Sequence, residues 1–231
     1  MTMIADNLQA VRARVSAACV AAGRPVHSVT LLAVSKTFAL PAIEEAIAAG
    51  QDCLGENYIQ EAVEKIRGLK NAVVQWHCLG PVQSNKTRLV AEHFHWVQSV
   101  DRLKIAQRLS EQRPAHLPPL QLCIQVNTDG GANKAGVNPE ALADLAQAVA
   151  RLPRLKLRGL MSIPEPASDF SAAKAVHIRA RQLFDGLNAQ GLALDTLSMG
   201  MSADLEAAVH AGSTMVRVGT AIFGGRPARR S

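Results

Sequence analysis

The sequence predicts an α/β protein: a single (β/α)8 barrel of the TIM type with an extra helix before its first strand. Short apolar, β-prone runs alternate with helical patterns along the 231 residues, and the runs number eight. Several runs, such as residues 120–126, are almost continuously apolar, which is typical of parallel strands covered on both faces. Eight strands exceed the roughly five or six of a usual doubly wound sheet. A barrel of this length commonly forms one domain, here residues 1–231.

The predicted elements follow in order from the N-terminus. Apolar residues at helical spacing between residues 3 and 22 define a first helix, which Gly23 ends. The predicted strands span residues 29–35, 52–54, 73–79, 95–99, 121–127, 156–161, 194–198 and 215–218. The helices between them span residues 40–49, 58–68, 84–92, 101–112, 139–151, 170–189 and 202–211. Breakers stand where helices should end, at Gly50, Gly68, Pro114 and Gly212.

Composition and charge favour a protein that binds a small molecule. No apolar stretch reaches the roughly 18 residues that cross a bilayer, and the charged N-terminal pattern is not a signal peptide. The net charge is +6, yet only 3% of residues are aromatic, which leaves few platforms for stacking bases. We therefore expect a cytoplasmic protein that binds neither membranes nor nucleic acid, and whose basic balance suits an anionic small ligand. Because no long apolar stripe marks an obligate dimer, we expect a monomer.

The cysteines indicate a reducing environment. Cys19, Cys53, Cys78 and Cys123 are widely spaced, and no two form a C-x-x-C pair. Three of them fall in predicted strands. We expect four buried, reduced thiols.

Lys36 ends the first predicted strand, in the run Val34-Ser35-Lys36-Thr37. A lysine at this place faces either solvent, as a surface residue that caps the strand, or a pocket. In a pocket, the amine loses hydration and its pKa falls. An amine that is deprotonated near neutral pH can form a Schiff base with an aldehyde, so Lys36 is a candidate for attaching a carbonyl ligand.

Polar and glycine residues follow the predicted strands, where a barrel of this kind carries its chemistry. Two of these segments have the composition of a phosphate site: Gly200 with Ser202 after the seventh strand, and Gly219 with Thr220 after the eighth. Free N–H groups at a helix start bind phosphate oxygens, and glycine permits close approach. Serine and glycine are also common helix caps, so the argument rests on the two segments together, at the strands that usually hold a phosphate.

Arg217 stands inside the last predicted strand, between Val216 and Val218. It points either outward between helices, where it would pair with a carboxylate, or inward toward a bound ring. The residues alone leave both orientations open.

Two further motifs do not indicate a functional site. Residues 80–87 have the spacing of a P-loop, but Asn85 replaces the second glycine and Pro81 removes a backbone donor, so we expect no NTPase activity. His93 and His95 have the spacing of metal ligands, but no carboxylate or cysteine cluster accompanies them. We expect no metal site.

Taken together, these segments resemble the pyridoxal phosphate homeostasis protein family, whose members are similar to the barrel domain of alanine racemase and other fold-type III enzymes. The resemblance covers nearly the whole chain, and the order and spacing of its segments are specific. It runs through residues 32–36, 55–61, 77–86, 159–161, 198–202 and 217–224.

The resemblance implies that Lys36 holds pyridoxal 5′-phosphate (PLP) as a Schiff base and that Ser202, Gly219 and Thr220 hold its phosphate. It also implies that Arg217 lies beside the pyridine nitrogen, where it disfavours ring protonation and weakens the cofactor as an electron sink. The full predicted cofactor-binding set is Lys36, Asn57, His77, Ser198, Ser202, Arg217, Gly219 and Thr220. No catalytic and no metal-binding residue is predicted.

One position departs from the family. An acidic residue often stands three positions before the lysine of the loop after the fifth strand, and this chain has Gly131 there, before Lys134. Any role of that acidic residue therefore does not transfer to this chain.

Three functions are compatible with these residues. We predict a non-catalytic PLP carrier in intracellular PLP (vitamin B6) homeostasis, whose partners are PLP and apo-enzymes that receive it. The alternatives are a fold-type III amino-acid racemase and a phosphate-binding barrel enzyme without PLP, which would be colourless. The related racemases use a tyrosine from a second, β-rich domain opposite the lysine. The single tyrosine here is Tyr58, after the second strand, and we expect no second domain.

Overall fold

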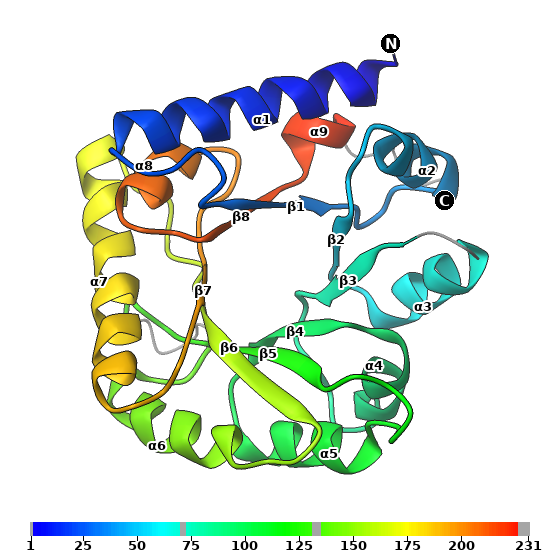
Figure 1. Cartoon of the computed structure of the whole chain (residues 1–231), viewed down its shortest axis with the longest axis vertical. Coiled ribbons are helices and arrows are strands. Elements are labelled where there is room, and N and C mark those ends of the chain that lie inside the picture. Colours follow the sequence, from blue (N-terminus) through cyan, green and yellow to red (C-terminus); the bar gives the residue numbers. More distant parts are fainter. Residues whose placement is uncertain (1, 70–72, 131–134, 226–231) are drawn as a thin grey trace.

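Eight parallel strands close into a barrel in chain order, β1 to β8, and helices surround it (Figure 1). The computed structural model describes residues 2–69, 73–130 and 135–225. Each strand pairs with the next one along the chain, and β8 pairs with β1 in parallel register, for example Arg217 opposite Leu32. The predicted (β/α)8 barrel is confirmed.

All eight predicted strands are present. Their bounds are β1 Thr30–Val34, β2 Cys53–Glu56, β3 Gln75–Cys78, β4 Trp96–Val100, β5 Leu120–Gln125, β6 Leu155–Met161, β7 Thr196–Ser198 and β8 Met215–Val218. The shortest predicted strand, residues 52–54, corresponds to a strand of four residues, all of them buried.

The predicted helices are also present. Their bounds are α1 Met3–Ala21, α2 Leu40–Ala48, α3 Ile59–Gly68, α4 Thr87–His93, α5 Leu103–Gln112, α6 Pro139–Ala150, α7 Phe170–Ala189 and α8 Leu205–His210. A further short helix, α9 Thr220–Phe223, follows β8 and was not predicted from the sequence. The start of α8 differs from the prediction of residue 202, because Met201 to Asp204 form a turn in which Asp204 N–H donates to the Met201 carbonyl at 3.2 Å. This turn is part of the site described below.

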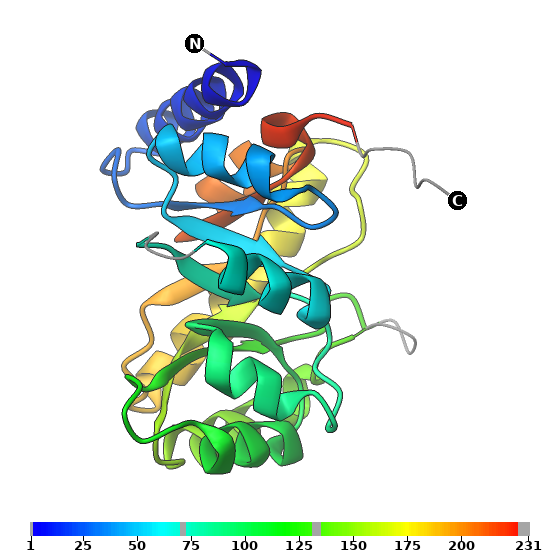
Figure 2. The same cartoon turned by 90° about the vertical axis from the view of Figure 1, so that its right-hand side faces the viewer.

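The N-terminal helix α1 lies across α8 and α9 at one edge of the barrel (Figures 1 and 2). Its buried residues include the predicted apolar face: Ile4, Leu8, Val11, Val15 and Cys19. Arg14 pairs with Glu206 of α8, with 2.9 Å between Arg14 Nη2 and Glu206 Oε1. Among the described residues, no helix has both the length and the apolar character needed to cross a bilayer.

The main apolar core lies between the strands and the helices. Two smaller clusters are separate from it: one of Leu32, Cys53, Leu79 and Met215, the other of Trp96, Cys123 and Met161. These residues alternate along their strands with residues of the main core, so their side chains face the barrel interior. All four cysteines are buried and unpaired, as predicted.

Candidate functional site

A cavity of about 330 Å³ lies at the carboxyl ends of the strands, where six of the eight predicted site residues line it. These six are Lys36, Asn57, Ser202, Arg217, Gly219 and Thr220. The remaining lining residues are mostly apolar: Val34, Leu79, Met161, Ile163, Met201 and Ala203. Segments from both ends of the chain thus meet at one site.

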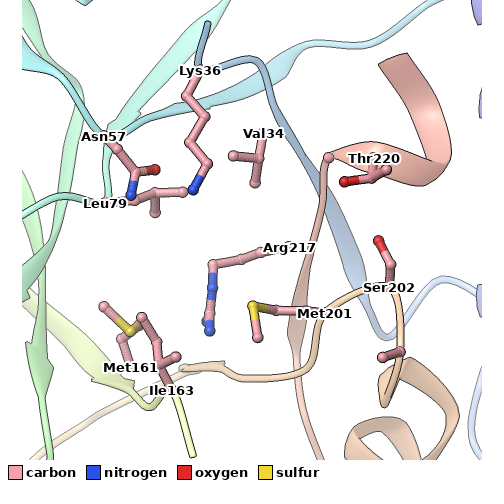
Figure 3. Close-up of a pocket in the computed structure, with 12 residues that line it drawn as sticks. Val34, Lys36, Asn57, Leu79, Met161, Ile163, Met201, Ser202, Arg217 and Thr220 are labelled. Atoms are coloured by element: carbon pink, nitrogen blue, oxygen red, sulfur yellow. The ribbon is translucent and has the colours of Figure 1, made fainter. Parts of the chain in front are cut away.

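The half-buried Lys36 side chain extends into this cavity, with its amine near Asn57 and Leu79 (Figure 3). The next residue, Thr37, has a φ of 70°, a left-handed conformation that is an outlier for a β-branched residue. Its N–H donates to Glu61 Oε1 of α3 at 2.8 Å. The surrounding fold therefore holds a strained turn beside the lysine, and Lys36 faces a pocket rather than bulk solvent.

A buried charge cluster supports that turn from α3. The Lys65 amine donates to Glu56 Oε1 at 2.8 Å and to the Ser35 carbonyl at 3.0 Å. Ser35 Oγ donates to the same Glu56 oxygen at 2.6 Å. Burial raises the pKa of Glu56, and the Lys65 charge acts in the opposite direction. The cluster joins β1, β2 and α3 directly behind Lys36.

Asn57 reaches the cavity because Gly80 has no side chain. A Cβ at Gly80 would lie 2.0 Å from the Asn57 carbonyl oxygen, so no other residue permits this approach of the two loops. Tyr58, the next residue, is 51% exposed and does not line the cavity.

Arg217 points inward, which settles the orientation that the sequence left open. Its side chain is 5% exposed and lies in the middle of the cavity's lining (Figure 3). Nη1 donates to Ser198 Oγ at 2.7 Å and Nη2 to the Ser162 carbonyl at 2.8 Å. No described carboxylate forms an ion pair with it, and burial lowers the pKa of Arg217 to about 10, so it stays cationic at neutral pH. A buried cation with neutral partners suits an anionic or acceptor ligand.

Ser202 and Thr220 lie together on the opposite side of the cavity from Lys36 (Figure 3). The backbone N–H groups of Ser202, Gly219 and Thr220 have no hydrogen-bond acceptor within the described part of the chain. Gly219 lies close to the Val34 carbonyl, where an added Cβ would be at 3.1 Å. Two hydroxyls and several unpaired N–H donors thus converge, which is the composition of a phosphate site.

The turn that carries Ser202 is held by the half-buried Asp204 and the buried His177. Asp204 Oδ1 accepts from the Met201 N–H at 2.7 Å, and Asp204 Oδ2 lies 2.9 Å from Nε2 of the buried His177. Burial acts to raise the pKa of Asp204, but the hydrogen bonds from His177 and Met201 outweigh it and the pKa lies below its usual value.

Ser198 and His77 do not line the cavity. Ser198 lies beneath Arg217 and accepts its hydrogen bond. His77 is fully buried, its ring stacks on Trp96 with 5.0 Å between centroids, and it faces a second cavity of about 590 Å³ at the amino ends of the strands. Leu79, two residues further along the same strand face, lines the first cavity instead. In this geometry, His77 does not contact a ligand in the first cavity directly.

Other residues named from the sequence lie elsewhere. Gly131 and Lys134, and the tail residues from 226 onward, fall outside the described residues. His95 Nδ1 accepts from the Trp76 N–H at 3.1 Å, and His93 Nδ1 lies 3.0 Å from the Leu89 carbonyl. The described residues hold no group of three or more His, Cys, Asp or Glu side chains arranged for a metal ion.

The sequence analysis did not identify Gln98 or Ser162 as site residues. Gln98 accepts from Ser198, which in turn binds Arg217, and the Ser162 carbonyl accepts from Arg217 directly. Gln98 stands in β4 between Val97 and Ser99, and a buried glutamine inside a barrel strand is the signal that was available. Ser162 contributes only its backbone carbonyl. Every residue type has this group, so the sequence carries no signal for it.

Comparison with known proteins identifies the family. A family model described as the N-terminal domain of alanine racemase matches residues 5–227. A pyridoxal phosphate homeostasis protein from Pseudomonas aeruginosa is 58% identical over 226 residues, which cover 98% of this chain and 97% of that relative. The chain belongs to the pyridoxal phosphate homeostasis protein family. Another member, from Vibrio cholerae, is 52% identical over 235 residues and is covered completely.

Solved structures place the same family on this fold. PipY of Synechococcus elongatus, described with PLP bound, is 38% identical with a TM-score of 0.84, and the match covers 96% of this chain and all of PipY. An alanine racemase of Clostridium difficile is 15% identical with a TM-score of 0.72, and the match covers 87% of this chain and 54% of the racemase. The likeness to the racemase concerns the fold alone.

Proposed function

We propose that this protein binds PLP in the first cavity, attached to Lys36 as a Schiff base, and serves in PLP homeostasis without catalysing a reaction. The observation that carries the proposal is the joint placement of the Lys36 amine, the Arg217 guanidinium and the hydroxyls of Ser202 and Thr220 around one cavity (Figure 3). Relatives with the homeostasis name and a PLP-bound neighbour support the identity of the ligand.

The residues present fit the parts of this cofactor. The Lys36 amine is the nucleophile for the aldehyde. Ser202, Thr220 and the free N–H groups beside them are donors for the phosphate. Arg217 has no acceptor atom and keeps its protons, so it would donate to the ring nitrogen of a bound cofactor and leave it unprotonated. Bound PLP supplies an aldehyde and an electron-withdrawing ring, and an unprotonated ring withdraws electrons less.

The absence of a second acid–base residue in the lining supports a carrier. Among the described residues that line the cavity, the ionisable side chains are Lys36 and Arg217. Tyr58, the single tyrosine of the chain, is outside the lining. Racemisation requires proton delivery on the face opposite the base, and no described side chain is placed for it. The racemase alternative is supported by the shared fold, which by itself does not define function.

The role of carrier sets a further requirement on the site. Lys36 has to release PLP to other amines, which requires amine exchange but no removal of a carbon-bound proton. We propose apo-enzymes that use PLP as the recipients.

Proton exchange at an amino acid separates the carrier from the racemase. The PLP-loaded protein is incubated with L-alanine in D2O, and deuterium at Cα and the appearance of D-alanine are measured by NMR and chiral chromatography, against free PLP at the same concentration. The proposal predicts no exchange beyond that of free PLP. Turnover of even ~1 s⁻¹, the low end for ordinary enzymes, would restore the racemase.

A further inference from the structure

Four buried polar side chains form a chain of hydrogen bonds through the barrel interior. Arg217 Nη1 donates to Ser198 Oγ at 2.7 Å, and Ser198 Oγ donates to Gln98 Oε1 at 2.6 Å. Gln98 Nε2 lies 3.0 Å from His77 Nδ1. The residues come from β8, β7, β4 and β3, and none is more than 5% exposed. This relay runs from the first cavity toward the second, at the opposite end of the barrel.

The relay has a single direction, which Arg217 imposes. A guanidinium can only donate, so Ser198 Oγ accepts from it and sends its one hydrogen to Gln98 Oε1. That contact fixes the orientation of the Gln98 amide, and its Nε2 therefore donates to His77 Nδ1. The same Nε2 lies 3.1 Å from Met215 Sδ, a weak acceptor, which agrees with this orientation. His77 must then carry its proton on Nε2, a buried atom that has no acceptor among the described residues, on a ring that lines the second cavity.

The protonation state of His77 is consistent with this direction of the relay. Burial lowers the pKa of His77 to about 3, with a smaller contribution from His95, so the ring is neutral at physiological pH. A protonated ring would present an N–H to the Gln98 amide, which would have to turn over and lose its bond from Ser198. The relay therefore depends on a neutral histidine at its far end.

Arg217 depends on the relay for its orientation. Its two recorded partners are the Ser198 hydroxyl and the Ser162 carbonyl, and no described carboxylate holds it. The Ser198 hydroxyl is itself held by Gln98. Without Gln98, that hydroxyl would be free to rotate, and the buried guanidinium would keep one firmly placed acceptor instead of two.

We propose that Gln98 is a positioning residue for the cofactor: through Ser198, and oriented by His77, it holds Arg217 in the direction from which it meets the pyridine ring. The part that concerns PLP rests on the proposed function. The direction of the relay does not, because it is a property of the protein without ligand.

A double-mutant cycle tests the positioning role. Gln98→Met keeps the length of the side chain and removes its hydrogen bonds, and Ser198→Ala breaks the next link. Each variant is expected to raise the Kd for PLP roughly three- to tenfold, the equivalent of one hydrogen bond. Because both act on one relay, the double variant should be no weaker than the weaker single variant. Ser198→Thr, which keeps the hydroxyl, should restore most of the affinity that Ser198→Ala loses.

Ser110→Ala is the matched control, because Ser110 on α5 is buried and its hydroxyl donates to the Pro153 carbonyl just before β6, outside the relay. It should lower the free energy of unfolding and leave the Kd for PLP unchanged. Wild-type affinity in Gln98→Met, or losses that add in the double variant, would overturn the positioning role.

Nitrogen NMR of the histidine rings tests the direction in the ligand-free protein, with the His77 signals assigned by their loss in His77→Gln. Wild type should show the proton on Nε2. In Gln98→Glu, the carboxylate accepts from both neighbours, so His77 should carry a proton on Nδ1. A proton on Nδ1 in wild type would refute the relay even if PLP binds. If PLP does not bind wild type while the Nε2 proton is found, the proposed function fails and the direction of the relay stands.

Discussion

Thr220 and Ser202 bring hydroxyl groups to a turn that already offers free backbone donors. A hydroxyl adds one hydrogen bond to a charged phosphate, and hydrogen bonds to charged groups contribute about 1.5–3 kcal/mol. The contribution of the hydroxyl is therefore separable from that of the backbone, which a side-chain substitution leaves in place.

Thr220→Ala should weaken PLP binding roughly 10- to 150-fold, since each 1.4 kcal/mol is about tenfold. Pyridoxal has no phosphate and should be affected far less. Titration of both ligands followed by visible absorbance measures the difference. Thr196→Ala, whose hydroxyl lies at the opposite end of the barrel, is the control and should bind both ligands like wild type. Equal losses for PLP and pyridoxal in Thr220→Ala would place Thr220 away from the phosphate.

His77 makes the fold sensitive to acid. Its pKa falls from 6.5 in the unfolded chain to about 3 in the fold, because burial disfavours the charged ring. Its contribution to stability is complete above pH 6.5 and is lost as the pH falls toward 3, because only the unfolded state binds the proton in this window. In that window the free energy of unfolding should fall by about 1.4 kcal/mol per pH unit from this group.

His77→Gln removes the titrating group and should flatten that part of the pH profile. Denaturant unfolding at about pH 7 and about pH 4 compares the two proteins, and wild type should lose more stability than the variant between them. If wild type and His77→Gln lost the same stability between the two pH values, His77 would be protonated in the folded protein. That result would also weaken the argument for its Nε2 proton.

At the scale of elements, α3 determines the geometry of the Lys36 turn. Lys65 and Glu61 of α3 bind the backbone on either side of Lys36, and Glu56 of β2 completes the cluster. The side chains of Lys65 and Glu56 are 7% and 0% exposed. Removing one partner of such a pair leaves the other buried without compensation.

Lys65→Met should therefore lower the free energy of unfolding by about 3–5 kcal/mol. The double variant Lys65→Met/Glu56→Gln should recover much of this loss, because no buried charge remains unpaired. Arg181→Met, which breaks an exposed pair with Asp185, should cost less than about 1 kcal/mol. Urea unfolding of the four proteins measures these differences. A loss in Lys65→Met as small as in Arg181→Met would mean that the cluster does not stabilise the turn.

At the scale of the whole molecule, the barrel was predictable because its strands are apolar runs and its helices have a clear periodicity. Loops that follow parallel strands gather at one end, so the order of segments along the chain was enough to bring Lys36, Ser202 and Thr220 together, whereas the inward orientation of Arg217 was left open. The start of α8 was placed too early because the residues from Ser202 to Asp204 suit a turn and a helix start equally well.

The depth of a side chain within the barrel was not predictable from the sequence. His77 in β3 and Leu79, which follows the strand, point the same way, and only the register between strands puts Leu79 at the cavity and His77 a layer deeper. Gln98 meets Ser198 across 100 positions of sequence, a contact that depends on the stagger of β4 against β7. Neither residue type nor spacing encodes that stagger.

The central claim is that PLP is held by a covalent bond to Lys36, and chemical trapping tests it most directly. The PLP-loaded protein is reduced with borohydride, digested, and mapped by mass spectrometry. The account predicts a pyridoxyl group on the peptide that carries Lys36, and no stable label in a Lys36→Ala variant. A label that falls mainly on Lys86 or Lys134 in wild type, or one that persists undiminished in the variant, would contradict it.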